Sequence, residues 1–225
     1  MSVNPIFMTV TGPSCSGKSY LVNHLIEKYP DQFQVLLSDT TRKPRPGEVN
    51  GVEYNFVTEQ YFEENMQNEG YCQFVQFNGI SYGTSKSDLQ SIFDAGKTPI
   101  RIVEPTGVTQ FKFVASDMDF SVFSIFVSGS PELCMSRWLQ RYYETIYDSK
   151  DADDLIADHE FYVRRMTSCF LHEFDWIDHQ PYNFYLDCDT QDFSSMSHSL
   201  SRIATGKVNM SVANGLAPYP HKEAA

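Results

Sequence analysis

Short apolar runs alternate with amphipathic stretches along most of this chain, which is the pattern of strands alternating with helices. The runs that predict strands cover residues 6–11, 33–37, 99–103, 121–127 and 184–186. The amphipathic stretches predict helices over residues 17–29, 85–95, 130–141 and 193–204, and a further long helix that ends near residue 174. Strands that alternate with helices pair into a parallel sheet, so we expect an α/β protein.

Residues 38–95 depart from this alternation and predict a separate small unit. Residues 40–58 contain two prolines and two glycines, so this part begins as turns and extended chain. Spaced apolar and aromatic residues then predict a small antiparallel sheet. These residues are Val52, Tyr54, Phe56, Tyr71, Phe74 and Phe77. Residues 59–67 predict a helix inside the same unit.

Two further stretches stand out by composition. Residues 144–160 are unusually acidic, and their aspartates are Asp148, Asp151, Asp153, Asp154 and Asp158. Either a mobile acidic lid or the solvated face of a helix accounts for such a stretch, and both interpretations stay open. Residues 206–225 are rich in Gly, Pro and Ala, which predicts a disordered tail.

The first predicted strand runs directly into a glycine-rich loop of the form GxxxxGK[ST]. The loop consists of Gly12, Pro13, Ser14, Cys15, Ser16, Gly17, Lys18 and Ser19. Gly12 and Gly17 let backbone N–H groups approach phosphate oxygens. Lys18 can reach the β- and γ-phosphates, the Ser19 hydroxyl can ligate Mg²⁺, and the positive end of the next helix points at the same anion. The loop therefore predicts a site for a nucleoside triphosphate with Mg²⁺.

A second group of residues predicts a pocket for a monophosphate. Arg42 and Arg45 lie three positions apart around a proline turn and can both donate to one phosphate. Tyr54 and Tyr82 offer hydroxyl donors to the same group. This pocket is distinct from the triphosphate site on the glycine-rich loop.

Composition limits the partners of the chain. The formal net charge of −12 repels nucleic acids and anionic lipids, so we expect small phosphorylated molecules held where arginines cluster. No apolar run approaches the length of about 18 residues that spans a membrane, and the N-terminal residues show no secretory signal. The five cysteines are widely spread and form no CxxC pair. We therefore expect a cytoplasmic protein with small-molecule nucleotides as partners and no contact with nucleic acid or membrane.

Together these residues closely resemble guanylate kinase, in the nucleoside monophosphate (NMP) kinase branch of the P-loop proteins. The resemblance runs from about Phe7 to Ala204, and its most specific parts are TTRKPRPGE, GVEYNF and YGTS. It implies a CORE of residues 1–37 and 96–205 with a parallel sheet and flanking helices. It also implies an inserted mixed-sheet NMP-binding domain of residues 38–95 and a helical LID near residues 142–163. Such an enzyme uses ATP as phosphoryl donor with Mg²⁺, as a monomer or a homodimer.

The resemblance also implies roles for individual residues. The loop residues, with Tyr20, Arg137 and Cys188, are implied in binding ATP, and Ser19 in binding the metal. The residues implied in binding the acceptor are Ser38, Arg42, Arg45, Tyr54, Gln73, Tyr82, Thr84, Glu104, Arg141 and Arg165. The residues implied in catalysis are Lys18, Arg42, Arg137, Arg141 and Arg165, with Arg164 as the one-residue alternative to Arg165.

Departures from the family pattern leave the acceptor open. Gln73 stands where the family has a glutamate that reads the guanine edge. The family's DxD pattern is reduced to Glu104, because Ile102 replaces its first acid. GMP or dGMP is the leading acceptor, since the rest of the pocket is retained, and another nucleoside monophosphate is the alternative. A non-catalytic binding module is a second alternative, although such modules typically lose the lysine that Lys18 provides here.

Overall fold

A five-stranded sheet forms the centre of the structure, a computed structural model that describes residues 4–45, 47–77, 79–148, 152–190 and 193–206. In spatial order its strands are β2 (Phe33–Val35), β7 (Thr98–Ile102), β1 (Ile6–Thr11), β8 (Ser121–Ser128) and β9 (Phe184–Asp187). Every neighbouring pair is parallel, which confirms the predicted α/β class.

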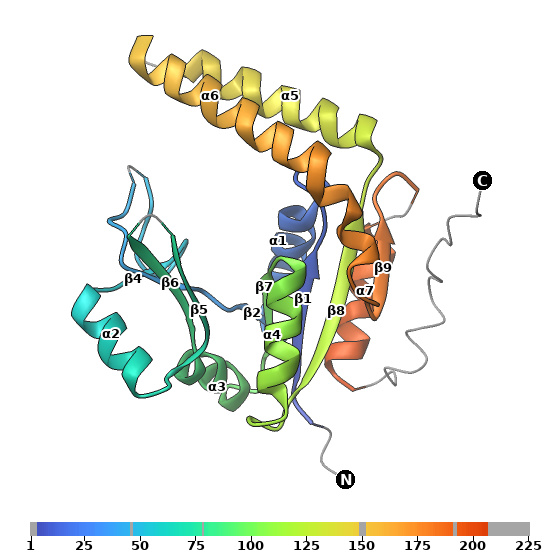
Figure 1. Ribbon diagram of the computed structural model, residues 1–225. Helices are drawn as coiled ribbons and strands as arrows, with labels where there is room; N and C mark the ends of the chain where they lie inside the picture. The colour runs from blue at the N-terminus through green and yellow to red at the C-terminus, as the bar shows by residue number, and fades with distance from the viewer. Residues whose placement is uncertain (1–3, 46, 78, 149–151, 191–192, 207–225) are drawn as a thin grey trace.

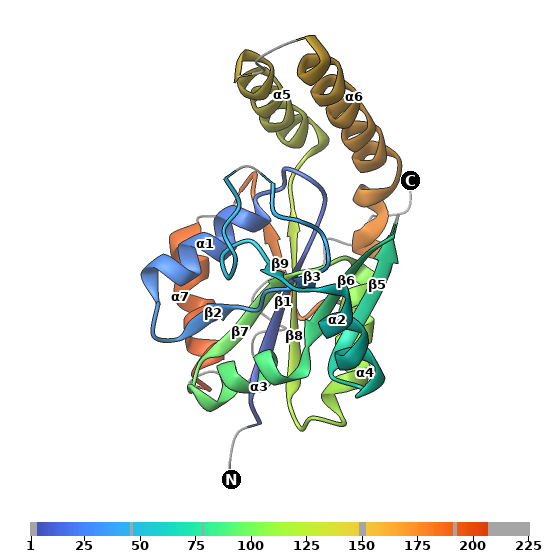
Figure 2. The same ribbon diagram turned by 90° about the vertical axis from the view of Figure 1, so that its left-hand side faces the viewer.

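Helices cover both faces of this sheet (Figures 1 and 2). On one face lie α1 (Lys18–Lys28) and α7 (Phe193–Ala204), and on the other lie α3 (Lys86–Asp94) and α4 (Pro105–Ala115). Helix α4 lies in a stretch, residues 105–115, to which the sequence analysis assigns no element. Pro105 occupies the first turn of the helix, where a missing N–H group costs nothing.

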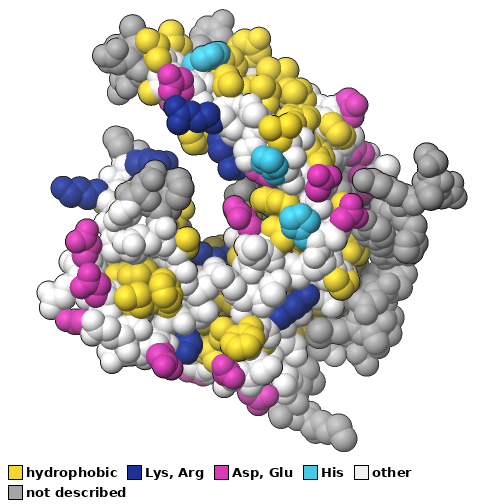
Figure 3. Space-filling view, in the orientation of Figure 1, with side chains coloured by type: hydrophobic (Ala, Val, Ile, Leu, Met, Phe, Trp, Pro, Cys, Tyr) yellow, Lys and Arg dark blue, Asp and Glu magenta, His cyan; other side chains and the backbone are white. Residues whose placement is uncertain are grey.

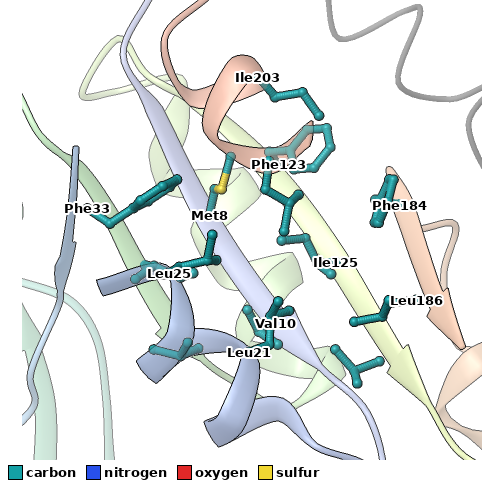
Figure 4. Close-up of a cluster of buried hydrophobic side chains, with 14 of the residues drawn as sticks. Met8, Val10, Leu21, Leu25, Phe33, Phe123, Ile125, Phe184, Leu186 and Ile203 are labelled. Carbon is teal, nitrogen blue, oxygen red and sulfur yellow. The ribbon is translucent and has the colours of Figure 1, made fainter. Parts of the chain in front are cut away.

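The central strand β1 is buried on both faces, which explains its continuous apolar sequence. Met8 and Val10 pack with Leu21 and Leu25 of α1, and all four side chains are fully buried (Figure 4). On the opposite face, Phe7 meets Phe111 of α4, with the two ring centroids 4.5 Å apart. Burial of large side chains on both faces holds the loop after β1 at a rigid edge of the sheet.

A second, smaller sheet contains β4 (Asn55–Phe56), β3 (Asp39–Thr40), β6 (Ile80–Ser85) and β5 (Tyr71–Phe77) in that order. β3 and β4 run parallel and the other pairs run antiparallel, which confirms the mixed sheet that the family resemblance implies; the residue pattern alone predicted only the antiparallel part. Parallel neighbours need a long connection, which the turn-rich residues 41–54 supply. Helix α2 (Glu59–Gln67) has the predicted bounds and begins at Thr58, whose Oγ1 accepts from the Tyr61 N–H at 3.1 Å.

Two long helices, α5 (Pro131–Asp148) and α6 (Ala152–Ser168), form a pair above the carboxyl ends of the central strands (Figure 1). α5 does not end near Arg141 as expected, because Trp138 stacks on Tyr142 one turn later and both rings contact Tyr162 of α6. The long helix expected up to residue 174 is divided into α6, a π-helical turn (Cys169–Glu173) and a 3₁₀ turn (Phe174–Asp178).

The acidic stretch enters both of these helices. Glu144 on α5 and Glu160 on α6 are exposed, whereas Asp158 on α6 is partly buried, so both interpretations of the stretch stay open. Asp151 and the predicted tail from residue 207 onward lie outside the described residues, as do the side chains of Asp148, Asp153 and Asp154. Across the part of the chain that the structure describes, we find no helix both long and apolar enough to cross a bilayer.

Candidate active site

The molecule is hollowed beneath the α5–α6 pair, and Lys and Arg side chains lie around this hollow (Figure 3). Two cavities lie at the carboxyl ends of the parallel strands, where α/β proteins bind ligands. The first cavity, of about 500 Å³, follows β1 and is lined by Ser14, Cys15, Gly17, Lys18, Ser19, Tyr20, Arg137, Arg141 and Arg165. The second cavity, of about 560 Å³, follows β7 and reaches the second sheet.

The glycine-rich loop has the backbone that its sequence predicts. Gly12 has a φ of 149°, and a Cβ at this position would lie 2.0 Å from the carbonyl oxygen of Val127, so only glycine fits. Gly17 has a φ of 109° and is the N-cap of α1. Helix α1 therefore begins at Lys18, beside the first cavity, with its positive end available to an anion.

The ammonium of Lys18 lies inside the loop. Its Nζ donates to the carbonyl oxygens of Gly12 at 2.8 Å and of Pro13 at 2.7 Å. Burial lowers the pKa of Lys18, whereas the nearby Glu173 carboxylate acts in the opposite direction. The loop thus holds Lys18, the phosphate-binding lysine that the sequence predicts, at the lining of the first cavity.

Arginines from the two long helices reach the same cavity. Arg137 of α5 donates to the carbonyl oxygens of Cys15 at 3.2 Å and Ser16 at 3.1 Å. Arg165 of α6 donates to Ser14 Oγ at 2.8 Å. Arg164 instead pairs with Glu160 at 2.8 Å, and its side chain is 80% exposed. Of the two arginines that the sequence left open, Arg165 is the one at the loop.

Glu173 is a residue of this site that sequence reasoning missed. It is almost fully buried, and its Oε2 accepts from the Ser14 N–H at 2.6 Å and from Ser14 Oγ at 2.7 Å. Its Oε1 lies 3.7 Å from the Arg165 guanidinium. One carboxylate therefore joins the π-helical turn after α6 to the glycine-rich loop.

The second cavity brings together five of the predicted acceptor residues, namely Ser38, Gln73, Tyr82, Thr84 and Glu104. Ser38 and Thr84 are buried, and Gln73 Nε2 donates to Thr84 Oγ1 at 3.5 Å. Arg101 of β7 lines the same cavity and is a second residue that sequence reasoning missed.

The predicted phosphate-binding residues of the acceptor form a cluster beside the second cavity, which only Tyr82 among them lines. The Arg42 guanidinium makes two hydrogen bonds to the Glu48 carboxylate, at 2.7 and 2.9 Å, and lies over the Tyr54 ring with 5.3 Å to its centroid. Glu48 also accepts from the Arg45 N–H at 2.7 Å. These hydrogen bonds lower the pKa of Glu48 to about 2. The Tyr54 and Tyr82 rings meet edge to face at 6.0 Å.

Cys188 lines neither cavity. It packs partly buried against the hydrophobic cluster on the α1 side of the sheet, and burial raises the pKa of its thiol to about 11. The Arg137 side chain lies beside this thiol. The predicted role of Cys188 in binding ATP therefore stays a prediction.

A sequence model of the guanylate kinase family, described as "Guanylate kinase", matches residues 5–177. This chain belongs to the guanylate kinase family. The guanylate kinase of Clostridium perfringens (strain 13 / Type A) is 31% identical over 185 residues, which cover 75% of this chain and 83% of that protein. That of Idiomarina loihiensis is 32% identical over 182 residues, covering 79% and 81%.

Another relative matches over a shorter stretch, and a solved structure matches over most of the chain. The guanylate kinase of Chlamydia muridarum is 38% identical over 108 residues, and this chain spans about half of its length, 53%. A crystal structure of guanylate kinase from Anaplasma phagocytophilum superposes with a TM-score of 0.53 at 18% identity, covering 92% of this chain and 88% of that one. This likeness shows the fold.

Proposed function

We propose that the protein is a guanylate kinase that transfers the γ-phosphoryl group of ATP to GMP or dGMP. The observation that carries this proposal is the pairing of two cavities at one edge of the sheet. Lys18 and three arginines line the first, and the predicted base-binding residues of the acceptor line the second. A binding module has no need of the first cavity, and the intact loop disfavours that alternative.

Lys18, Arg137, Arg141 and Arg165 are the proposed catalytic residues of the first cavity. Phosphoryl transfer requires alignment and neutralisation of charge more than covalent chemistry, and these four cations supply both. A monophosphate oxygen is already anionic, so the acceptor needs no general base. Closure over the nucleotides excludes water, which would otherwise accept the phosphoryl group.

The donor set of the first cavity fits Mg²⁺ carried by a nucleotide. Ser19 at the start of α1 lines the cavity and offers one hydroxyl oxygen. Mg²⁺ usually takes one or two protein ligands together with phosphates and water, so no protein cage is needed. Within the described residues, no cluster of three His, Cys, Asp or Glu side chains forms such a cage. Bound there, Mg²⁺ would neutralise phosphate charge.

On the acceptor side, we propose that Arg42, Arg45, Tyr54 and Tyr82 bind the phosphate of the nucleotide. Arg42 and Tyr54 are held together by the contact of the guanidinium with the ring, and Glu48 holds the turn that carries both arginines. The base of the nucleotide then lies in the second cavity, next to Ser38, Gln73 and Thr84.

The proposed domain division has residues 38–95 as the NMP-binding domain, residues 142–163 as the LID and the remainder up to residue 205 as the CORE. Domain closure brings the two nucleotides together. We propose that the protein works in the cytoplasm on small-molecule nucleotides, as a monomer or a homodimer. Its cysteines are free, as expected of a reducing compartment.

A coupled assay of ADP release with ATP, Mg²⁺ and a panel of nucleoside monophosphates tests this proposal. GMP or dGMP should be turned over, and Lys18→Ala should lower turnover by about 10²- to 10³-fold, because a charge at the transferring phosphoryl group is lost. Lys112→Ala is the matched control, since Lys112 lies on α4 and bonds Gln180 away from both cavities. Normal turnover by Lys18→Ala would refute the catalytic role of the loop.

A further inference from the structure

Arg101 occupies a position that core packing does not explain. It lies on β7, an interior strand between β2 and β1, where apolar side chains are the rule. Its neighbour Ile100 is fully buried in the core, whereas Arg101 is half-buried and lines the second cavity. It lies near the carboxyl end of its strand, which is the end where this fold binds ligands.

The guanidinium of Arg101 is fixed by neutral acceptors only. It donates to the Leu36 carbonyl oxygen at 3.3 Å and to Ser38 Oγ. Over the described part of the chain, no carboxylate lies within ion-pair distance of it. Asp39, a carboxylate that acts on its charge from farther away, already accepts hydrogen bonds from Tyr71 at 2.9 Å and Asn55 at 3.0 Å.

This arginine stays charged at neutral pH. Burial lowers the pKa of Arg101 to about 10, which is still well above 7. A guanidinium has five N–H donors and no acceptor, and two of the five are used by Leu36 and Ser38. A half-buried cation with unused donors favours a ligand that presents acceptors to it.

The hydrogen-bonding groups on the purine edge distinguish the candidate acceptor bases guanine, hypoxanthine and adenine. Guanine and hypoxanthine both present two adjacent acceptors, O6 and N7, which is the pair that a guanidinium binds with two parallel hydrogen bonds. Adenine replaces O6 with an amino donor, so an N–H of Arg101 would face an N–H of the base. Arg101 can therefore tell a 6-oxopurine from adenine.

Gln73 cannot read the other edge of guanine fully. Its Nε2 is directed at Thr84 Oγ1, and its Oε1 faces the first turn of α4, 3.6 Å from where a Cβ on Gly107 would lie. One amide oxygen can accept from N1–H, which guanine and hypoxanthine share. The 2-amino group of guanine finds no second acceptor on this side chain.

We propose that Arg101 binds the O6 and N7 atoms of the acceptor base and is the main specificity-determining residue of the second cavity. The acceptor class is then a 6-oxopurine nucleoside monophosphate, and IMP is accepted beside GMP. This inference rests on the proposed function in one respect, that the second cavity holds the acceptor base.

Calorimetry of GMP, IMP and AMP binding to the whole protein tests the inference without relying on turnover. The protein should bind GMP and IMP within about tenfold of each other, because they differ by one neutral hydrogen bond. AMP should bind about 5- to 150-fold more weakly, the discrimination of one bidentate pair. Arg101→Met should weaken the binding of GMP and IMP by a similar factor and leave the binding of AMP unchanged. The ratio of the affinities for GMP and AMP should then approach one.

Controls separate recognition from folding. ATP affinity and melting temperature report whether Arg101→Met is folded, and Lys112→Ala removes a cation outside the cavity. Arg101→Gln is the second variant, because an amide can turn either its donor or its acceptor to the base and should lose the same discrimination. An unchanged GMP-to-AMP ratio in the folded variants would overturn the inference. So would a preference for GMP over IMP above about 100-fold, which one neutral hydrogen bond cannot supply.

The same samples, assayed for ADP release, distinguish this inference from the proposed function. If the predicted preferences in binding appear but no monophosphate is phosphorylated, the kinase function fails and the role of Arg101 stands. If none of the three monophosphates binds, both fail.

Discussion

The contact of Glu173 with the glycine-rich loop allows a prediction of stability. Glu173→Gln replaces a buried carboxylate by a neutral amide of nearly the same shape. The carboxylate accepts two short hydrogen bonds from Ser14, at 2.6 and 2.7 Å. Hydrogen bonds to a charged group contribute about 1.5–3 kcal/mol each, against about 0.5–1.5 for neutral ones.

The expected loss follows from that difference. Two bonds that each weaken by about 1–1.5 kcal/mol lower the free energy of unfolding by about 2–3 kcal/mol. The pair with Arg165 at 3.7 Å adds little, because the arginine side chain is half exposed. In a chain of this size, the loss corresponds to a fall in melting temperature of about 4–12 °C.

Denaturant unfolding of the variant and the unaltered protein measures this difference. Glu160→Gln is the matched control, because Glu160 makes an exposed pair with Arg164 on the same helix as Arg165 and should cost less than about 0.5 kcal/mol. A Glu173→Gln variant as stable as this control would refute the view that the carboxylate holds the loop. Ser14→Ala in the Glu173→Gln background should add less than it does alone, since the two residues are coupled.

Other predictions concern the acceptor and the lid. Arg42→Ala and Arg45→Ala should each weaken binding of the monophosphate by roughly 10- to 150-fold, because one charge-assisted hydrogen bond is lost. Calorimetry should show ATP binding unchanged. Equal losses for both ligands would mean that they share a single pocket. Amide hydrogen exchange over residues 142–163 should slow when ATP and GMP analogues are bound together, and an unchanged rate would contradict a closing lid. Because the pKa of Glu48 is lowered from 4.5 to about 2, its bonds with Arg42 should be complete above pH 4.5 and lost as pH falls through about 2. An NMR titration of the Glu48 carboxyl should show that midpoint, and Arg42→Ala should move it toward 4.5.

Most regular elements could be predicted because their cause is local. The apolar run of β1 and the capped, amphipathic helix α2 have the bounds that their periodicity predicts. The errors arose where local rules were overridden. Helix α4 begins at Pro105, where the sequence analysis assigned no helix. Helix α5 continues past its predicted end because Trp138 packs on the ring of Tyr142 and on Tyr162 of α6.

The sequence by itself determined the chemistry of the loop, because Gly12, Lys18 and Ser19 lie close together in the chain. The backbone needs the glycine, and the lysine and serine supply the charge and the hydroxyl. Only the tertiary structure decided which arginine meets that turn and which acid holds it, since Glu173 lies 159 positions from Ser14. It also decided that Arg101, in an apolar strand, faces a cavity shared with Ser38 and Gln73. Parallel strands bring their carboxyl ends to one edge of the sheet, and no local pattern records which side chains meet there.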